Sequence, residues 1–245
     1  MTDTAIIGGT GLTTIKTLEI TRREVVQTPY GEPSGPLTFG KLGGNEVVFL
    51  PRHGSGHTIP PHQVNYRANI WALHSVGVQD IIAVAAVGGI SNDMSPTRIA
   101  FPDQIIDYTW SRGNTYFEDG AADVTHIDFT YPYCQALRQK LIDAATSIAL
   151  DIVPHGTYCA TQGPRLETAA EIKKLEIDGC DLVGMTGMPE AALARELGIC
   201  YATCAVVANY AAGKSPGIID IADIDRNLKQ GMDKVRSLLE AVLTA

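Results

Sequence analysis

The sequence lacks the features that mark membrane, secreted or nucleic-acid-binding proteins. No apolar stretch is long enough to span a bilayer, and Met1–Thr4 does not begin a basic and then apolar secretory signal. The formal net charge is −8, and no basic run exceeds two residues, which argues against an extended surface for nucleic acid. We therefore expect a cytoplasmic protein that binds neither membranes nor nucleic acids.

Cysteines are few and scattered, at positions 134, 159, 180, 200 and 204. An odd number of cysteines, most of them inside apolar runs, is typical of buried reduced thiols rather than of disulfides or zinc ligands. Cys200 and Cys204 lie four residues apart on an expected strand, so we expect both to pack on one face. The sequence predicts that all these cysteines are reduced.

The chain also lacks a linker, a low-complexity tract or a repeat, so residues 1–245 are expected to form a single domain. Apolar runs predict strands at Ala5–Gly8, Leu37–Leu42, Glu46–Leu50, Asp80–Val87, Gln104–Asp107, Gly156–Thr161, Asp181–Gly184 and Ile199–Ala208. Apolar residues three and four apart predict helices at about His62–Val76, Pro132–Leu150, Glu167–Ile177, Pro189–Glu196 and Ile224–Leu243. Strands that alternate with helices indicate an α/β fold with a mixed, mainly parallel sheet.

What the sequence does have is a cationic, histidine-rich loop at a strand end, where α/β sheets bind ligands. Arg52–His62 follows the apolar run Val47–Leu50 and contains three of the six histidines. The guanidinium of Arg52 and an imidazole donor from His53 suit inorganic phosphate. The alternative is a solvated loop with incidental histidines.

Three other strand ends offer donors to the same kind of ligand. Gly8–Gly11 can turn backbone N–H groups and the Thr10 hydroxyl toward an anion, and Val87–Ile90 offers further N–H groups. Gly184–Gly187 places Thr186 just before a helix, whose N-terminus favours anions. The glycines do not match a dinucleotide fingerprint or a P-loop. Together these ends indicate one small anion, with phosphate as a reactant.

Glu167 and Asn209 are polar residues at two more strand ends. From the residues alone two interpretations remain open. Glu167 could complement a helix dipole and Asn209 could cap a turn, or both could face a ligand.

In their order and spacing, these fragments resemble the trimeric purine nucleoside phosphorylase and methylthioadenosine phosphorylase family. The resemblance covers nearly the whole chain and is carried by Gly8–Leu12, Arg52–His57, Val64–Leu73, Gly163–Glu167, Met185–Thr186, Pro189–Glu190 and Gly198–Ala202. It implies a sheet that closes into a distorted barrel flanked by helices, in a homotrimer with shared active sites. It also implies phosphorolysis, in which phosphate displaces a purine from C1′ of a nucleoside without any metal or organic cofactor.

The resemblance assigns roles at the phosphate and ribose end of the site. Phosphate would be bound by Thr10, Arg52, His53, the backbone of Ala86 and Thr186, and the ribose would be seated by Met185. Position 85 departs from the methylthioadenosine pattern, because alanine stands where that branch has a hydroxyl residue. Loss of that hydroxyl puts one contact to phosphate and sugar in doubt.

At the base end, Glu167 and Asn209 resemble the pair that 6-oxopurine phosphorylases use, with Leu166 beside them. The adenine-specific branch instead has aspartates at positions 209 and 211 and a small hydroxyl residue at 167. Hypoxanthine carries a proton on N1 that a carboxylate accepts, whereas adenine N1 is itself an acceptor. Each mismatched polar contact costs about 1–3 kcal/mol. The sequence therefore predicts a 6-oxopurine base, with Arg52, His53 and Asn209 as the catalytic residues.

The 5′ end points to an apolar substituent. Phosphorylases of ordinary inosine place a histidine near the last helix, but this chain has none after His155. Ile221 and Ile224 would line an apolar pocket there, and His126 matches a residue that the neighbouring subunit extends over the 5′ group. Otherwise His126 would be a buried structural histidine.

The combined prediction is phosphorolysis of 5′-methylthioinosine to hypoxanthine and 5-methylthioribose 1-phosphate, by a pentosyltransferase of purine salvage. The alternatives are a methylthioadenosine phosphorylase, an ordinary inosine or guanosine phosphorylase, a hydrolase that uses water, and a nucleoside-binding sensor without turnover.

Overall fold

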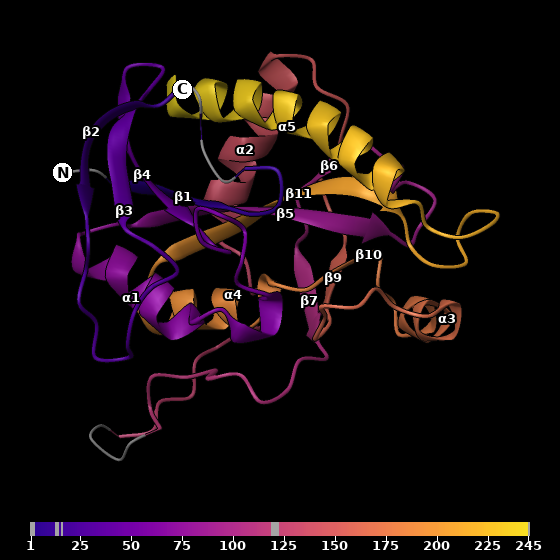
Figure 1. Cartoon of the computed structure of the whole chain (residues 1–245), viewed down its shortest axis with the longest axis horizontal. Coiled ribbons are helices and arrows are strands. Elements are labelled where there is room, and N and C mark those ends of the chain that lie inside the picture. The colour runs from indigo at the N-terminus through magenta and orange to yellow at the C-terminus, as the bar shows by residue number, and fades with distance from the viewer. Residues whose placement is uncertain (1–2, 13–14, 16, 119–122, 245) are drawn as a thin grey trace.

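The computed structural model describes residues 3–12, 15, 17–118 and 123–244 (Figure 1). The strands are β1 (Thr4–Gly8), β2 (Glu19–Glu24), β3 (Leu37–Leu42), β4 (Asn45–Pro51), β5 (Asp80–Gly89), β6 (Ile99–Ala100), β7 (Gln104–Asp107), β8 (Ile152–Val153), β9 (Thr157–Ala160), β10 (Leu182–Gly184) and β11 (Cys200–Tyr210). The helices are the 3-10 turn η1 (Pro61–Gln63), α1 (Tyr66–Ser75), α2 (Gln135–Ser147), α3 (Ala169–Ile177), α4 (Gly187–Glu196) and α5 (Ile221–Thr244).

The strands form one mixed sheet around β5. β5 pairs in parallel with β1 and β11 and antiparallel with β10. The main path runs β2-β3-β4-β1-β5-β10-β9-β7, and β11 continues through β6 to β8. The predicted α/β class with a mixed sheet is confirmed. Closure of this sheet into a barrel stays a prediction.

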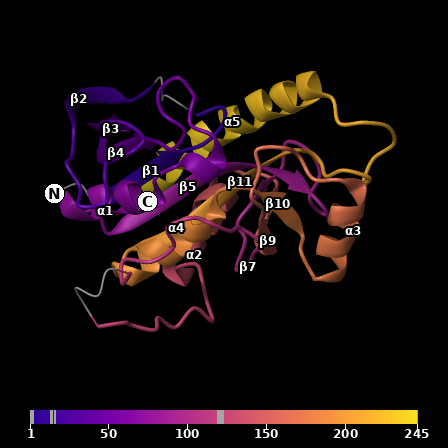
Figure 2. The ribbon, with the colours of Figure 1, turned by 60° about the horizontal axis from the view of Figure 1, so that its bottom comes forward.

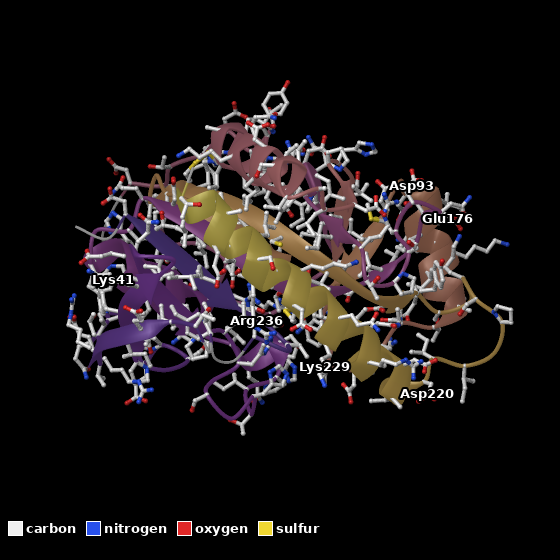
Figure 3. All side chains as sticks on the ribbon, turned by 90° about the horizontal axis from the view of Figure 1, so that it is seen from above. Lys41, Asp93, Glu176, Asp220, Lys229 and Arg236 are labelled. Atoms are coloured by element: carbon white, nitrogen blue, oxygen red, sulfur yellow. A yellow bond between two sulfur atoms is a disulfide. The ribbon has the colours of Figure 1, made fainter. Side chains whose placement is uncertain are left out.

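Helices cover both faces of the sheet. In Figure 1, α2 and α5 lie above the strands and α1 and α4 lie below, while α3 lies at the end toward which β5 and β11 point. Figure 3 shows α5 crossing the strands, with Asp220 close to its first turn and Lys229 near its middle. Helix α5 and strand β11 lie so close together that a Cβ on Gly231 of α5 would be 2.2 Å from a methyl of Val206 on β11. None of the described helices is both long enough and apolar enough to cross a membrane.

Side chains along the central strands point alternately to the two faces of the sheet, which explains why helices cover both faces. Side chains two residues apart on a strand share a face, so Ile82 and Val84 of β5 pack with α5 in one core, which includes Leu228 and Val235. On the other face of β5, Ile81 and Ala83 belong to a second core with α1 and α4. The central strands are therefore buried on both faces, which is why they appear in the sequence as continuous apolar runs.

Strand β2 was missed in the sequence and the starts of two helices were placed too early, and each difference has a local cause. All residues of β2 are exposed, so it has no apolar alternation to reveal it. The helix expected from His62 is a 3-10 turn followed by α1, which Asn65 caps by accepting a hydrogen bond from the N–H of Ala68. The helix expected from Glu167 begins after Thr168, whose side chain forms a reciprocal capping box with Glu171. Glu167 therefore lies outside the helix.

The prediction that every cysteine is reduced is wrong for Cys134 and Cys200, which form a disulfide with their Cα atoms 5.2 Å apart. The two cysteines meet because the segment before α2 lies along β11, where the N–H of Cys134 donates to the carbonyl of Tyr201 at 2.8 Å. Their separation of 66 residues hides this proximity in the sequence. The other cysteines, Cys159, Cys180 and Cys204, are free and buried as expected.

Candidate active site

The predicted site residues gather around a cavity of about 540 Å³ at the ends of β1, β4, β5, β10 and β11. Those that line it are Thr10, Arg52, His53, Ala86, Leu166, Glu167, Met185, Thr186, Asn209 and Ile224. They come from seven separate segments of the chain, so the fold alone brings them together. The loop between β9 and α3 forms the side of the cavity that carries Leu166 and Glu167.

Arg52 lies at the floor of the cavity and is 1% exposed. Its Nε and Nη2 donate to the two carboxylate oxygens of Glu190 at 2.7 and 2.8 Å, and its Nη1 donates to the carbonyl of Val84 at 2.8 Å. A guanidinium has five N–H donors. Three of them are bonded to described residues, which leaves two for an anion in the cavity.

Glu190 keeps Arg52 charged in spite of its burial. Burial alone would lower the pKa of Arg52, but the charge and the hydrogen bonds of Glu190 outweigh burial and raise the pKa above its usual value. Glu190 is fully buried in α4 and also accepts a hydrogen bond from the hydroxyl of Tyr201 at 2.8 Å. The sequence showed Glu190 only as part of a family fragment. Its role as the partner of Arg52 was missed, and no local pattern reveals it.

Gly9 is required for Arg52 to lie where it does. A Cβ at Gly9 would be 2.6 Å from the Val84 carbonyl oxygen and 2.9 Å from Nη1 of Arg52. Contacts this short force the neighbouring groups to move. The glycine turn after β1 thus opens the cavity floor to the guanidinium.

His53 lies beside Arg52 and is 5% exposed. Its Nδ1 is 2.8 Å from the carbonyl of Ile59, and because a carbonyl only accepts, Nδ1 carries the proton. Burial, helped by the charge of Arg52, lowers the pKa of His53 to about 4. At neutral pH its Nε2 is therefore an acceptor. This corrects the expected imidazole donor, because the proton on Nδ1 goes to the backbone.

The other phosphate candidates suit an anion in different ways. Thr186 comes just before α4, and its side chain forms no capping hydrogen bond to the helix. Because the backbone at Met188 is extended, the regular turns of α4 begin only after that residue. Thr10 and Ala86 line the same cavity, from the turn after β1 and from near the end of β5. His57, which has a left-handed φ of 52°, packs its ring against that of His53, with the centroids 4.6 Å apart and the planes tilted by 50°.

Glu167 lines the same cavity, from the loop between β9 and α3. Its Oε1 accepts a hydrogen bond from the hydroxyl of Thr161 at 2.7 Å. The helix-capping function that Glu167 might have served belongs to Glu171 instead. Glu167 is therefore left with one carboxylate oxygen that the Thr161 hydroxyl does not occupy.

Asn209 lies at a bulge of β11, where the pairing register with β5 shifts after Val207. Bulges commonly redirect a side chain at a functional site. One N–H of the Asn209 amide donates to the carbonyl of Tyr210 at 2.7 Å. A carboxamide has a second N–H and a carbonyl oxygen. The side chain can therefore both donate to and accept from a ligand.

Two of the predicted residues lie outside the cavity. Ile221 begins α5 and is 61% exposed, and Ile219 lines the cavity together with Ile224. His126 is exposed, so a buried structural histidine is wrong, and its contact with a neighbouring subunit stays a prediction.

The fold and this cavity define a phosphate-dependent nucleoside enzyme. The family model described as "Phosphorylase superfamily" matches residues 3–244, and the chain belongs to that family. A "probable S-methyl-5′-thioinosine phosphorylase" of Pseudomonas syringae is 54% identical, with 100% of both chains covered. A 6-oxopurine nucleoside phosphorylase of Pyrococcus furiosus is 48% identical over 97% of this chain and 91% of its own.

Solved structures agree with the fold. Methylthioadenosine phosphorylase from Schistosoma mansoni in complex with adenine superimposes with a TM-score of 0.93 at 32% identity. The match covers 100% of this chain and 91% of that protein. The backbone therefore closely resembles that of an enzyme whose structure holds adenine.

Proposed function

We propose that this protein catalyses the phosphorolysis of 5′-methylthioinosine, which yields hypoxanthine and 5-methylthioribose 1-phosphate. The observation that carries the proposal is that Glu167 and Asn209 line the same cavity as Arg52 and His53. One end of the cavity thus suits a 6-oxopurine and the other suits phosphate. The two curated relatives described above act, by their names, on S-methyl-5′-thioinosine and on 6-oxopurine nucleosides.

At the base end, we assign N1–H of hypoxanthine to Glu167 and the N7 or O6 edge to Asn209. The Thr161 hydroxyl occupies Oε1 of Glu167, so the remaining carboxylate oxygen is the acceptor for N1–H. As the glycosidic bond lengthens, negative charge collects on the leaving purine. A hydrogen bond donated by Asn209 stabilises that charge more in the transition state than in the ground state. Leu166 lies beside the base.

At the phosphate end, we assign the anion to Arg52, His53, Thr10, Thr186 and the N–H of Ala86. The Arg52–Glu190 pair has no net charge, and His53 is neutral at pH 7. Directed hydrogen bonds, rather than excess positive charge, therefore hold the anion. Phosphate that retains a proton can donate it to Nε2 of His53. Holding phosphate beneath C1′ supplies much of the acceleration through proximity.

The remaining parts of the prediction concern the 5′ group and the assembly. Ile224 and Ile219 line the cavity near the start of α5, and a thiomethyl group buried there gains roughly 1–2 kcal/mol over a hydroxyl. Met185 seats the ribose, and His126 of a neighbouring subunit covers the 5′ group in a homotrimer. Phosphate is the co-substrate, no other cofactor takes part, and the enzyme acts in the cytoplasm.

Phosphate dependence tests the class of reaction. Purified protein is incubated with methylthioinosine with and without phosphate, and hypoxanthine and the sugar product are quantified. We expect hypoxanthine and a sugar 1-phosphate in equal amounts, and only when phosphate is present. Release of hypoxanthine with free methylthioribose would indicate a hydrolase, and tight binding without release would indicate a sensor.

A further inference from the structure

Arg112 is a cationic side chain that the proposed reaction does not use, and it bonds to two loops of the cavity. In the chain it follows β7 and precedes α2. The described parts of the segment between β7 and α2 lie on the side of α1 and α4 that faces away from the sheet (Figures 1 and 2). Its Nη1 donates to the carbonyls of Met185 and Met188 at 2.8 and 2.6 Å. Its Nη2 donates to the carbonyls of Gln162 and Thr161 at 2.9 and 3.3 Å.

The bonded carbonyls belong to the two loops that would hold the nucleoside. Met185 follows β10 and lines the cavity where the ribose is assigned. Thr161 follows β9, and its hydroxyl bonds to Glu167. One guanidinium thus joins the backbone on the base side to the backbone on the ribose side, and Arg112 itself is not among the residues that line the cavity.

Arg112 also approaches the loop of the phosphate end. Its Nη1 is 3.3 Å from the hydroxyl oxygen of Tyr66, and that hydroxyl donates to the carbonyl of Pro61 at 2.9 Å. Pro61 lines the cavity. This route is longer and weaker than the direct bonds to the two nucleoside loops. Of the assigned phosphate ligands, only Thr186 lies on a loop that Arg112 bonds to directly, so the nucleoside contacts as a set should depend on Arg112 more strongly than the phosphate contacts.

The shape of the guanidinium suits this task. Its donors are fixed in a plane and point in several directions, so one side chain can bond to four carbonyls on two loops. A lysine ammonium is a point charge with three donors on a flexible stem and cannot span the same set. The carbonyls of a strand end that lack sheet partners need such donors when they are buried.

We propose that Arg112 is a positioning residue, which fixes the spacing between the base loop at Thr161–Glu167 and the ribose loop at Met185–Met188. Through this spacing, Glu167 holds the purine while the ribose remains aligned with phosphate. The inference rests on the proposed function, since it assumes that these two loops bind one nucleoside. Removal of Arg112 should therefore weaken use of the nucleoside more than use of phosphate, because Thr186 is the one assigned phosphate ligand on a loop that Arg112 bonds to directly.

Arg138 provides a matched control, because it is a guanidinium that bonds to backbone carbonyls away from the cavity. It donates to Pro102, Phe101 and Pro154 at 2.9, 3.0 and 2.6 Å. Arg112→Met and Arg138→Met each remove a side chain that binds carbonyls. Arg112→Met releases the two loops of the cavity, whereas Arg138→Met releases backbone segments away from the cavity.

The experiment measures kcat and the two KM values of each variant, with the nucleoside that the wild-type enzyme uses best. A misplacement of about 1 Å at reacting groups can cost on the order of a hundredfold in rate. For Arg112→Met we expect kcat/KM for the nucleoside to fall about thirtyfold to a hundredfold, and phosphate KM to rise by less than about tenfold, since only Thr186 among the assigned phosphate ligands lies on a released loop. Arg138→Met should lower thermal stability but keep both KM values and kcat within about threefold, once corrected for folded protein.

An Arg112→Met enzyme with unchanged nucleoside kinetics would overturn the inference, as would equal losses in the nucleoside and phosphate KM values. If Arg112→Met does not yield folded protein, Arg112→Lys is measured in its place and judged by the same two outcomes. Because the best wild-type nucleoside is used, a preference for another nucleoside would refute the proposed substrate without deciding the role of Arg112.

Discussion

Arg52 and Glu190 form a buried bidentate ion pair at the floor of the cavity, although 138 residues separate them in the chain. The pair fixes the plane of the guanidinium and aims its remaining donors. Its energetic contribution is best seen when one partner is removed, since an unpaired buried charge costs about 3–5 kcal/mol.

Glu190→Gln should therefore impair both stability and phosphate use. The amide keeps the shape of the carboxylate but leaves Arg52 buried without its counter-charge. We expect the free energy of unfolding to fall by about 3 kcal/mol and phosphate KM to rise at least about tenfold. Denaturant unfolding and initial-rate kinetics measure the two effects. Asp151→Asn breaks the solvent-exposed pair of Asp151 with Arg98 and should cost less than about 1 kcal/mol; similar losses in both variants would argue against a special role for Glu190.

Gly9→Ala should reduce activity by displacing Arg52. The added methyl group would clash with the Val84 carbonyl and with Nη1 of Arg52. We expect kcat/KM for phosphate to fall on the order of a hundredfold. Gly35→Ala is the control, because its Cβ meets only Pro51 at an ordinary 3.5 Å. A Gly9→Ala enzyme as active as Gly35→Ala would show that the floor of the cavity adapts.

His53 should make the folded protein less stable as the pH falls below about 6.5. Burial, followed by the charge of Arg52, lowers the pKa of folded His53 to about 4, whereas the unfolded value is 6.5. Between these values the unfolded chain binds a proton that the folded chain does not bind, so acidification favours unfolding. The loss of stability due to His53 is absent above about pH 7 and increases as the pH falls to about 4.

His53→Gln removes that proton uptake. We expect the difference in the free energy of unfolding between His53→Gln and wild type to shift by about 2 kcal/mol in favour of the variant when the pH is lowered from 7 to 5 in phosphate-free buffer. Denaturant titrations at several pH values give the difference curve. A difference that does not change with pH would mean that His53 is protonated in the folded protein as readily as in the unfolded chain.

Asn209→Asp should move base preference toward the 6-amino purine. A carboxylate at this position accepts from an amino group and repels a lactam oxygen. The ratio of kcat/KM for methylthioinosine to that for methylthioadenosine should fall at least about tenfold, as expected for one mismatched polar contact. Asn45→Asp adds the same charge at the start of β4, outside the residues that line the cavity, and should leave the ratio unchanged. An unaltered ratio in Asn209→Asp would mean that another group reads position 6.

Much of the fold and of the cavity could be predicted because both follow from local signals. The central strands are buried on both faces, so they appear as apolar runs, and strand ends in an α/β sheet place their polar residues together. Thr10, Arg52, Thr186 and Asn209 line one cavity for this reason.

The parts that escaped prediction depend on contacts between distant segments. No local pattern pairs Arg52 with Glu190 or Cys134 with Cys200. The proton on Nδ1 of His53 is set by the Ile59 carbonyl, which only the folded loop brings near. The helix start after Thr168 was also missed, although its capping box with Glu171 is a local signal.

The most direct test of the account compares kcat/KM for methylthioinosine, methylthioadenosine, inosine and guanosine at saturating phosphate. We predict that methylthioinosine exceeds methylthioadenosine by at least about a hundredfold, from two mismatched polar contacts, and exceeds inosine by about tenfold, from burial of the thiomethyl group. A methylthioadenosine value equal to or above that of methylthioinosine would contradict the roles assigned to Glu167 and Asn209.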